Sequence, residues 1–273
     1  MDTVLKEKHE ALKAIFAPYE KTLVAYSGGI DSTLILKVAT DVLGRERAIG
    51  VIAKSETLTH DEFDEAMKVA QEQDFNVQTV SYSELEIENY ASNPLNRCYF
   101  CKSELYERLQ EVAKDVGAQA ICNGDNFDDI GDYRPGAQAA AEACILSPLK
   151  EARLGKADIR ALARHLGLPN WDKPSGACLS SRIPYGQQIT TDKLSAVGQG
   201  EKLLRSLGFR QVRIRHHGEI ARIEVLPQEM PRLLEPEVRS QIVEEIKKLG
   251  FNYVAIDLQG YRTGSMNETI KVK

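Results

Sequence analysis

The sequence predicts an α/β protein whose first part forms a mostly parallel sheet and whose second, smaller part is an α+β domain. Apolar strand-like runs alternate with helical patterns through the first part, as expected for a sheet covered on both faces. A stretch rich in Pro, Gly and Ser follows and fits neither periodicity. We therefore expect domains at 1–167 and 191–273, joined by a linker at 168–190 that carries Cys178.

The elements of the first domain follow from hydrophobic periodicity. Residues 3–18 have helical spacing of their apolar side chains. Strands are expected where short apolar runs recur, at 21–26, 47–53, 76–81, 118–122 and, as a short one, near 144–146. Helices are expected between and after them, at 31–43, 61–73, 99–116 and 156–166.

Two segments of the second domain resemble each other, at 203–218 and 245–260. Each combines a helix end, a Leu-Gly-Phe turn with Gly at the helix C-terminus, and a strand. A strand at 218–226 and a helix around 235–248 complete the predicted α+β domain. The similarity fits either an internal repeat or convergent packing.

Composition narrows the function classes. The chain has 273 residues, a net charge of −5 and 42% hydrophobic residues, values typical of a globular protein. It has no run of about 18 apolar residues, and its start is a charged amphipathic pattern rather than a secretion signal, so we expect a cytoplasmic protein without a membrane span. The acidic balance argues against coating of nucleic acid, although a local basic face could hold an RNA or a phosphorylated metabolite.

The strongest motif runs from Ala25 to Thr33 (AYSGGIDST), directly after the first strand and at the start of a helix. Gly28 and Gly29 allow the backbone N–H groups to approach an anion beside the helix N-terminus. Hydroxyl donors come from Ser27, Ser32 and Thr33. The helix end alone contributes roughly 0.3–1 kcal/mol, too little for a triphosphate, so we expect a divalent cation, Mg²⁺ by default, with Asp31 as a candidate ligand.

The motif lacks the spacing of a Walker A loop and contains no lysine that would reach the outer phosphates. It resembles the SGGxDS signature of the PP-loop ATP pyrophosphatases, which cleave ATP between the α- and β-phosphates. The resemblance therefore implies an adenine nucleotide α-hydrolase-like fold and acceptor adenylation rather than kinase chemistry.

Two other strand ends should contribute to the nucleotide site, because ligands bind at the carboxyl ends of parallel strands. Ser55 follows the second strand and is expected near the adenine and ribose. Gly124 and Asp128 belong to the segment NGDNFDD after the fourth strand, which resembles the second nucleotide-side loop of PP-loop enzymes. Its carboxylates either face Mg²⁺ or simply open a helix.

The five cysteines are not expected to form disulfides in a reducing compartment. Cys98 and Cys101 form a CxxC pair, and with the distant Cys178 they make a set of three thiolates suited to an iron–sulfur cluster with one iron lacking a protein thiolate. A zinc site would need a fourth ligand. His216 and His217 are candidates for it, but they lie on a predicted strand. The other cysteines, at 122 and 144, lie in apolar strand-like runs and are expected to be buried hydrophobic side chains.

Further motifs make the resemblance narrower: SGGIDSTL, DYRPG at 132–136, NWDK at 170–173, SSRIPYG at 180–186, VRIRHHGEIARIE at 212–224 and the final LxGYRTGSMNET. Together they resemble the LarE family of ATP-dependent sulfur transferases over nearly the whole chain. That family adenylates a carboxylate of pyridinium-3,5-biscarboxylate mononucleotide and converts it to a thiocarboxylate during synthesis of the nickel-pincer nucleotide cofactor.

The resemblance implies roles for particular residues. Some members of the family sacrifice a single cysteine, whereas others carry three cysteines thought to hold a [4Fe-4S] cluster. This sequence fits the three-cysteine type, and the resemblance implies that Cys178 and Asp31 are catalytic residues. It further implies a small mononucleotide substrate surrounded by Ser181, Arg182, Glu201, Arg213, Arg215 and Glu224, with Arg182 also catalytic. We expect the chain to form a homo-oligomer. Guanidinium groups suit such a substrate because they bind phosphate and carboxylate in a bidentate manner.

Three alternatives remain open at this point. Cys178 could itself be a sacrificial sulfur donor in place of a cluster. A PP-loop tRNA thiolase could also use CxxC, but it would favour a basic RNA-binding extension that the sequence does not show. A nucleotide-dependent regulatory module with structural zinc would not turn over ATP to AMP.

Overall fold

A computed structural model of the chain describes residues 1–130, 135–174, 176–262 and 265. The chain forms two compact units, one of residues Met1–Tyr90 and Asn96–Ser175 and one of Ala91–Leu95 and Gly176–Lys273. Parts of two motifs from the sequence, residues 132–134 of DYRPG and most of the end of LxGYRTGSMNET, lie outside the described residues.

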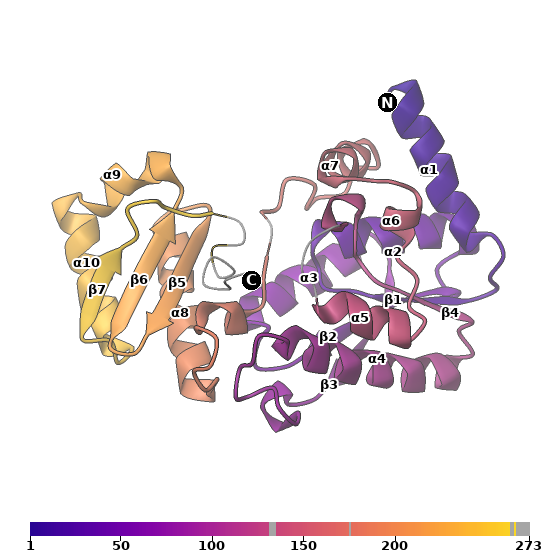
Figure 1. The fold of residues 1–273 in the computed structure, drawn as a ribbon. Coiled ribbons are helices and arrows are strands. Elements are labelled where there is room, and N and C mark those ends of the chain that lie inside the picture. The colour runs from indigo at the N-terminus through magenta and orange to yellow at the C-terminus, as the bar shows by residue number, and fades with distance from the viewer. Residues whose placement is uncertain (131–134, 175, 263–264, 266–273) are drawn as a thin grey trace. The chain divides into compact units, whose positions relative to one another are not determined.

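The first unit contains a parallel four-stranded sheet in the order β3-β2-β1-β4 (Figure 1). Its strands are β1 (Thr22–Ala25), β2 (Ala48–Lys54), β3 (Asn76–Ser81) and β4 (Ala120–Cys122). The strand expected near 144–146 is only a single parallel bridge between Cys122 and Leu146. A tight turn at Cys144 leaves too few extended residues for a longer pairing.

Helices cover both faces of this sheet (Figure 1). They are α1 (Thr3–Phe16), α2 (Ile30–Leu43), α3 (His60–Glu72), α4 (Arg97–Val116), α5 (Pro135–Glu142), α6 (Pro148–Glu151) and α7 (Lys156–His165), with short 3₁₀ turns η1 (Glu84–Glu86) and η2 (Phe127–Asp129). The long helices fall where the sequence predicted them; the short α5 and α6 were not expected.

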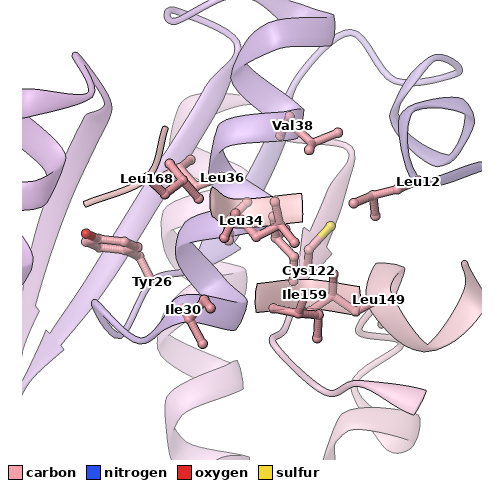
Figure 2. Packing of buried hydrophobic residues seen from close by; sticks show 14 of the residues in the cluster. Leu12, Tyr26, Ile30, Leu34, Leu36, Val38, Cys122, Leu149, Ile159 and Leu168 are labelled. Atoms are coloured by element: carbon pink, nitrogen blue, oxygen red, sulfur yellow. The ribbon is translucent and has the colours of Figure 1, made fainter. Parts of the chain in front are cut away.

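Strand residues alternate between two cores, as the pleat requires. Leu23 and Val51 pack with α4 and α5, whereas Val24 and Ile52 pack with helices of the other face. Figure 2 shows the core that contains Val24 and Ile52, to which α1, α2, α6, α7 and Cys122 contribute buried side chains. The predicted parallel α/β domain is thereby confirmed, and its strands present their carboxyl ends along one edge.

The second unit is a small mixed sheet in the order β5-β6-β7, with β5 antiparallel and β7 parallel to the central strand. Its elements are η3 (Leu179–Arg182), α8 (Thr191–Ser206), β5 (Val212–His217), β6 (Ile220–Val225), η4 (Pro227–Glu229), α9 (Met230–Leu233), α10 (Pro236–Lys248) and β7 (Tyr253–Ile256). The glycines of the two Leu-Gly-Phe turns have φ of +87° at Gly208 and +98° at Gly250, which is the left-handed conformation that glycine provides after a helix.

A short segment from the middle of the chain belongs to the second unit. Asn93 donates from Nδ2 to the carbonyl oxygens of Ile183 (3.1 Å) and Pro184 (2.8 Å), and its own carbonyl accepts from the Gly186 N–H. No sequence pattern indicated this excursion, because the partners are about ninety residues apart. None of the described helices is long and apolar enough to cross a membrane.

Candidate functional site

The glycine loop between β1 and α2 is held against α3. Gly28 has φ +68°, and a Cβ placed on it would lie 2.4 Å from Cβ of Ala66, so no other residue fits. Gly29 is the N-cap of α2 and offers no side chain to the first turn. The N-terminal N–H groups of this 14-residue helix are therefore not capped by a side chain and face the edge where the strands end.

Hydroxyl groups of the loop keep its shape. Ser32 Oγ and Thr33 Oγ1 both donate to the carbonyl oxygen of Gly29, at 3.1 and 2.8 Å. Asn170, from the predicted NWDK motif, donates from Nδ2 to the Gly28 carbonyl oxygen and to Thr33 Oγ1. Ser27 is exposed, so its hydroxyl can reach a ligand, while a donor role of the two buried hydroxyls toward phosphate stays a prediction.

A lysine that sequence reasoning missed lies beside the loop. Lys156, the first residue of α7, donates from Nζ to both carboxylate oxygens of Asp31, at 2.8 and 2.6 Å. The motif itself contains no lysine, but the fold supplies one from a distant helix. The local signal was a Gly-Lys pair opening a helix after the last strand-like run, which indicates a position at the same edge of the sheet.

The segment after β4 approaches the same place. A Cβ on Gly124 would lie 3.4 Å from Cβ of Asp31, so the two backbones pass close to each other. Asp128 accepts the backbone N–H of Lys156 at 2.7 Å and thereby caps the start of α7. Asp31, Gly124, Asp128 and Lys156 thus form one group, whereas the described contact of the Ser55 hydroxyl is with Thr57, at 3.2 Å.

The CxxC pair lies on the first turn of α4, where positions i and i+3 share one face. Cys98 and Cys101 are both half-buried. The Cys101 thiol donates to Glu84 Oε1 at 3.4 Å, and Tyr90 donates to the other oxygen of this buried carboxylate at 2.8 Å. Glu84 is a neighbour that the sequence did not indicate, since it precedes the pair by a loop of irregular structure.

Cys178 belongs to the second unit, where it precedes η3 with an exposed side chain. Within the described part of the chain, no three His, Cys, Asp or Glu side chains gather as a metal site. Two thiols on one helical turn and a third that is exposed have the donor chemistry that an iron–sulfur cluster uses.

The remaining two cysteines differ from each other. Cys122 is fully buried as predicted, and burial raises the pKa of its thiol to about 12. The prediction that Cys144 is buried on a strand is wrong, because this residue is exposed and has φ +53°. It follows α5 in the left-handed position of a Schellman motif, in which the N–H groups of Cys144 and Ile145 return to the carbonyls of Ala141 and Ala140.

Four of the predicted substrate residues form two buried ion pairs in the second unit. Arg182 donates from Nε and Nη2 to the two carboxylate oxygens of Glu201, at 2.7 and 2.8 Å. Its Nη1 donates to the Cys178 carbonyl oxygen and to Ser181 Oγ, which fixes the backbone that carries the exposed thiol. Burial opposes ionisation of Glu201, but the hydrogen bond and charge of Arg182 prevail and hold the pKa of Glu201 below its usual value.

The second pair joins two neighbouring strands. Arg215 donates to both oxygens of Glu224 at 2.9 and 2.8 Å, and Glu224 is fully buried. The same guanidinium donates to the Ser181 carbonyl oxygen and to Ser265 Oγ. The structure therefore brings β5, β6 and η3 together around the residues that the resemblance implied.

Arg213 is the third buried arginine of this network. It lies over the ring of Tyr261, with Cζ 5.2 Å from the ring centroid, and donates to the Val212 carbonyl oxygen. Burial, and next the charge of Arg182, lower the pKa of the Arg213 guanidinium, which Glu201 partly offsets. Positive charge is thus concentrated where an anionic group would be stabilised.

Comparison with known proteins places these observations in a family context. The NAD synthase family matches residues 8–100. The chain is 42% identical over 266 residues to the pyridinium-3,5-bisthiocarboxylic acid mononucleotide synthase of Lactiplantibacillus plantarum, covering 97% of this chain and 96% of that protein. It is 43% identical over 267 residues to an uncharacterised protein of Synechocystis sp., covering 98% of this chain and 99% of that protein. Both similarities extend through both units.

Proposed function

The chain belongs to the LarE family of ATP-dependent enzymes, and we propose that it activates a carboxylate of pyridinium-3,5-biscarboxylate mononucleotide as an adenylate and converts it to a thiocarboxylate. The observation that carries this proposal is the glycine loop at the N-terminus of α2, with Asp31 and Lys156 beside it. The loop binds polyphosphate, and the family relationship indicates the acceptor.

ATP binds at the carboxyl edge of the first sheet in this proposal. The N–H groups of the loop and of the first turn of α2 hold the phosphates, and Lys156 moves from Asp31 to the phosphate oxygens when they arrive. The residues assigned to the nucleotide are Ala25, Ser27, Gly28, Gly29, Asp31, Ser32, Thr33, Ser55, Gly124 and Asp128.

Mg²⁺ fits this site because carboxylate oxygens are its preferred protein ligands. Asp31 would hold it, and when bound the ion neutralises charge on the phosphates. Release of the Lys156 ammonium from Asp31 is what makes the carboxylate available. A carboxylate oxygen of the acceptor then attacks the α-phosphorus, and pyrophosphate leaves.

The acceptor binds at the arginine network of the second unit. Arg213 and Arg215 take its anionic groups, and Arg182, held by Glu201, keeps the chain around Cys178 in place. Ser181 and Glu224 complete the set. Buried guanidinium groups select planar or tetrahedral oxyanions because of their fixed donor geometry.

Sulfur enters through the cysteines. We assign Cys98, Cys101 and Cys178 as ligands of a [4Fe-4S] cluster, which when bound supplies sulfide as the nucleophile. The acyl carbon of the adenylate forms a bond to sulfur, and AMP leaves with the C–O bond electrons. Thiol chemistry of this kind needs a reducing compartment, so we assign the enzyme to the cytoplasm. We also propose that it acts as a homo-oligomer. Direct donation by Cys178 is the alternative.

The test is product analysis of the full chain with ATP and the biscarboxylate mononucleotide. AMP and pyrophosphate should form only when the acceptor is present. Formation of ADP and phosphate would contradict adenylation. Thiolated tRNA as the product would show that the acceptor is a tRNA rather than the mononucleotide. Anaerobic purification with iron and sulfide analysis then addresses the cluster separately.

A further inference from the structure

Two arginines face each other across the antiparallel pair of β5 and β6 in the second unit. Arg215 of β5 is paired in register with Arg222 of β6, and Arg213 with Glu224. Like charges directly opposite each other destabilise an antiparallel pair. Glu224 relieves this repulsion, because its Oε1 accepts from Arg222 Nη2 at 3.1 Å as well as from Arg215 Nε at 2.9 Å.

Arg222 is only partly satisfied by these contacts. Its Nε is buried and has no hydrogen-bond acceptor among the described residues. The Oδ2 atom of Asp257 is 3.6 Å away, beyond hydrogen-bonding length, and Arg262 Nη1 lies 3.7 Å from the other oxygen of Asp257. A buried donor without an acceptor costs free energy, and that cost is removed when an oxyanion binds.

The position of Arg222 on the sheet makes it available to a ligand. Side chains alternate along β5, so Arg213, Arg215 and His217 share the face opposite Ile214, the residue that packs against α8 at Gly200. The side chain of Arg222 is 36% exposed, whereas that of Glu224 is 0% exposed, so Arg222 connects the buried network to solvent.

The pKa of His217 also indicates that positive charge dominates this face of the sheet. Burial lowers the pKa of His217, and Arg222 and Arg215 lower it further, while Glu224 opposes them. This face therefore carries a positive field in which a second cation is disfavoured and an anion is stabilised.

We propose that Arg222 and Arg215 form a two-guanidinium site for the phosphate monoester of the mononucleotide acceptor, a role that nothing in the sequence motifs assigned to Arg222. The inference rests on the proposed function, because it concerns how that acceptor is held. A phosphate fits better than a carboxylate, since two adjacent guanidinium groups match a dianion with three acceptor oxygens, and one carboxylate, Glu224, already lies between them.

The experiment is a double-mutant cycle in which the Arg222 guanidinium is removed from the protein and the phosphate is removed from the ligand. Binding of nicotinate mononucleotide, a pyridinium carboxylate mononucleotide, and of nicotinate riboside, which lacks the phosphate, is measured by calorimetry with the full chain. The wild-type chain should prefer the mononucleotide, and Arg222→Gln should reduce that preference about tenfold while leaving the riboside affinity unchanged. Arg222→Lys should retain part of the preference, because it keeps the charge but loses the planar donor pair.

The controls separate this inference from its premise. Arg239→Gln removes an exposed arginine of α10 and should change neither affinity. If Arg222→Gln weakens both ligands equally, or if Arg222→Gln and Arg222→Lys both keep the full preference for phosphate, the inference is wrong although the acceptor assignment stands. If the wild-type chain prefers neither ligand, the phosphate site is wrong, and acceptor-dependent AMP formation decides independently whether the proposed function survives.

Discussion

Lys156 Nζ lies 2.8 and 2.6 Å from the two carboxylate oxygens of Asp31, although 125 residues separate the two in the chain. The pair joins the first turn of α7 to the first turn of α2. A lysine ammonium and a carboxylate therefore lie together beside uncapped helix N–H groups. In this arrangement each neutralises the other, and a polyphosphate with its metal ion would separate them.

We predict that Lys156→Met lowers kcat/KM for AMP formation by roughly a hundredfold, because it removes a cationic donor that would stabilise the negative charge on the ATP phosphates as pyrophosphate leaves. Stability should change little, since the pair is partly exposed and such pairs contribute little to folding. Steady-state kinetics with varied ATP measures the effect. Lys247→Met, on the exposed face of α10, is the matched control, and Asp31→Ala should abolish turnover. Unchanged kinetics of Lys156→Met would show that this lysine does not act on the phosphates of ATP.

The loop itself was predictable because all its determinants are local. Gly28, Gly29 and the following helix lie within a few residues of one another, and their order alone indicates an anion site. Lys156 was not predictable in the same way, because only the packing of α7 against α2 brings it to Asp31. For the same reason, the sequence did not predict the contact of Glu84 with the CxxC pair or the contacts of Asn93 with Ile183 and Pro184.

Cys144 was misjudged for a different reason. Its neighbours are apolar, and an apolar run of three residues does not distinguish a strand from the end of a helix. The Schellman turn after α5 decides in favour of the helix end. In the second unit, family resemblance indicated which arginines matter, but not that Arg182 pairs with Glu201 and Arg215 with Glu224.

Replacing Arg213 by Ala should raise the KM of the acceptor about tenfold while leaving the KM of ATP nearly unchanged, because the arginine lies in the second unit and the glycine loop in the first. The same split is expected for Arg215→Ala, with an added loss of stability because Glu224 would remain buried without its bidentate partner. Kinetics with each substrate varied in turn measure it. An equal rise in both KM values would indicate a general disruption of the fold.

Stability should fall as the pH is lowered, and His9 is one cause. Burial, followed by the charge of Lys13, lowers the pKa of His9 below its ordinary value of 6.5, and its Nε2 has no hydrogen-bond partner among the described residues. Below that value the unfolded chain binds more protons than the folded one, so stability is lost as the pH falls from 6.5 toward the folded pKa. His216 and His217, whose pKa values are also lowered by burial, act in the same direction.

Urea unfolding at about pH 5 and about pH 7.5 tests this, with Trp171 as the fluorophore. It is the single tryptophan and packs against the core that α1 helps to form, so it reports on the unit containing His9. His9→Gln should reduce the loss of stability between the two pH values, whereas His60→Gln, at an exposed position, should leave it unchanged. Equal pH dependence in all three proteins would exclude His9 as the cause.

The last prediction concerns the source of sulfur. If Cys98, Cys101 and Cys178 are ligands of one cluster, replacing any one of them by Ala should lose iron, sulfide and sulfur transfer together, because three thiolates are the minimum that leaves a single open iron. Cys122→Ala and Cys144→Ala should retain transfer: the first thiol is fully buried, and the second lies in the turn that ends α5. Iron and sulfide analysis of anaerobically purified variants, together with intact mass before and after one turnover, measures both outcomes. Suppose instead that Cys98→Ala and Cys101→Ala complete a single turnover and that Cys178 loses the mass of H₂S. The carbon–sulfur bond of Cys178 would then have broken, leaving dehydroalanine, and its exposed thiol rather than a cluster would be the sulfur donor.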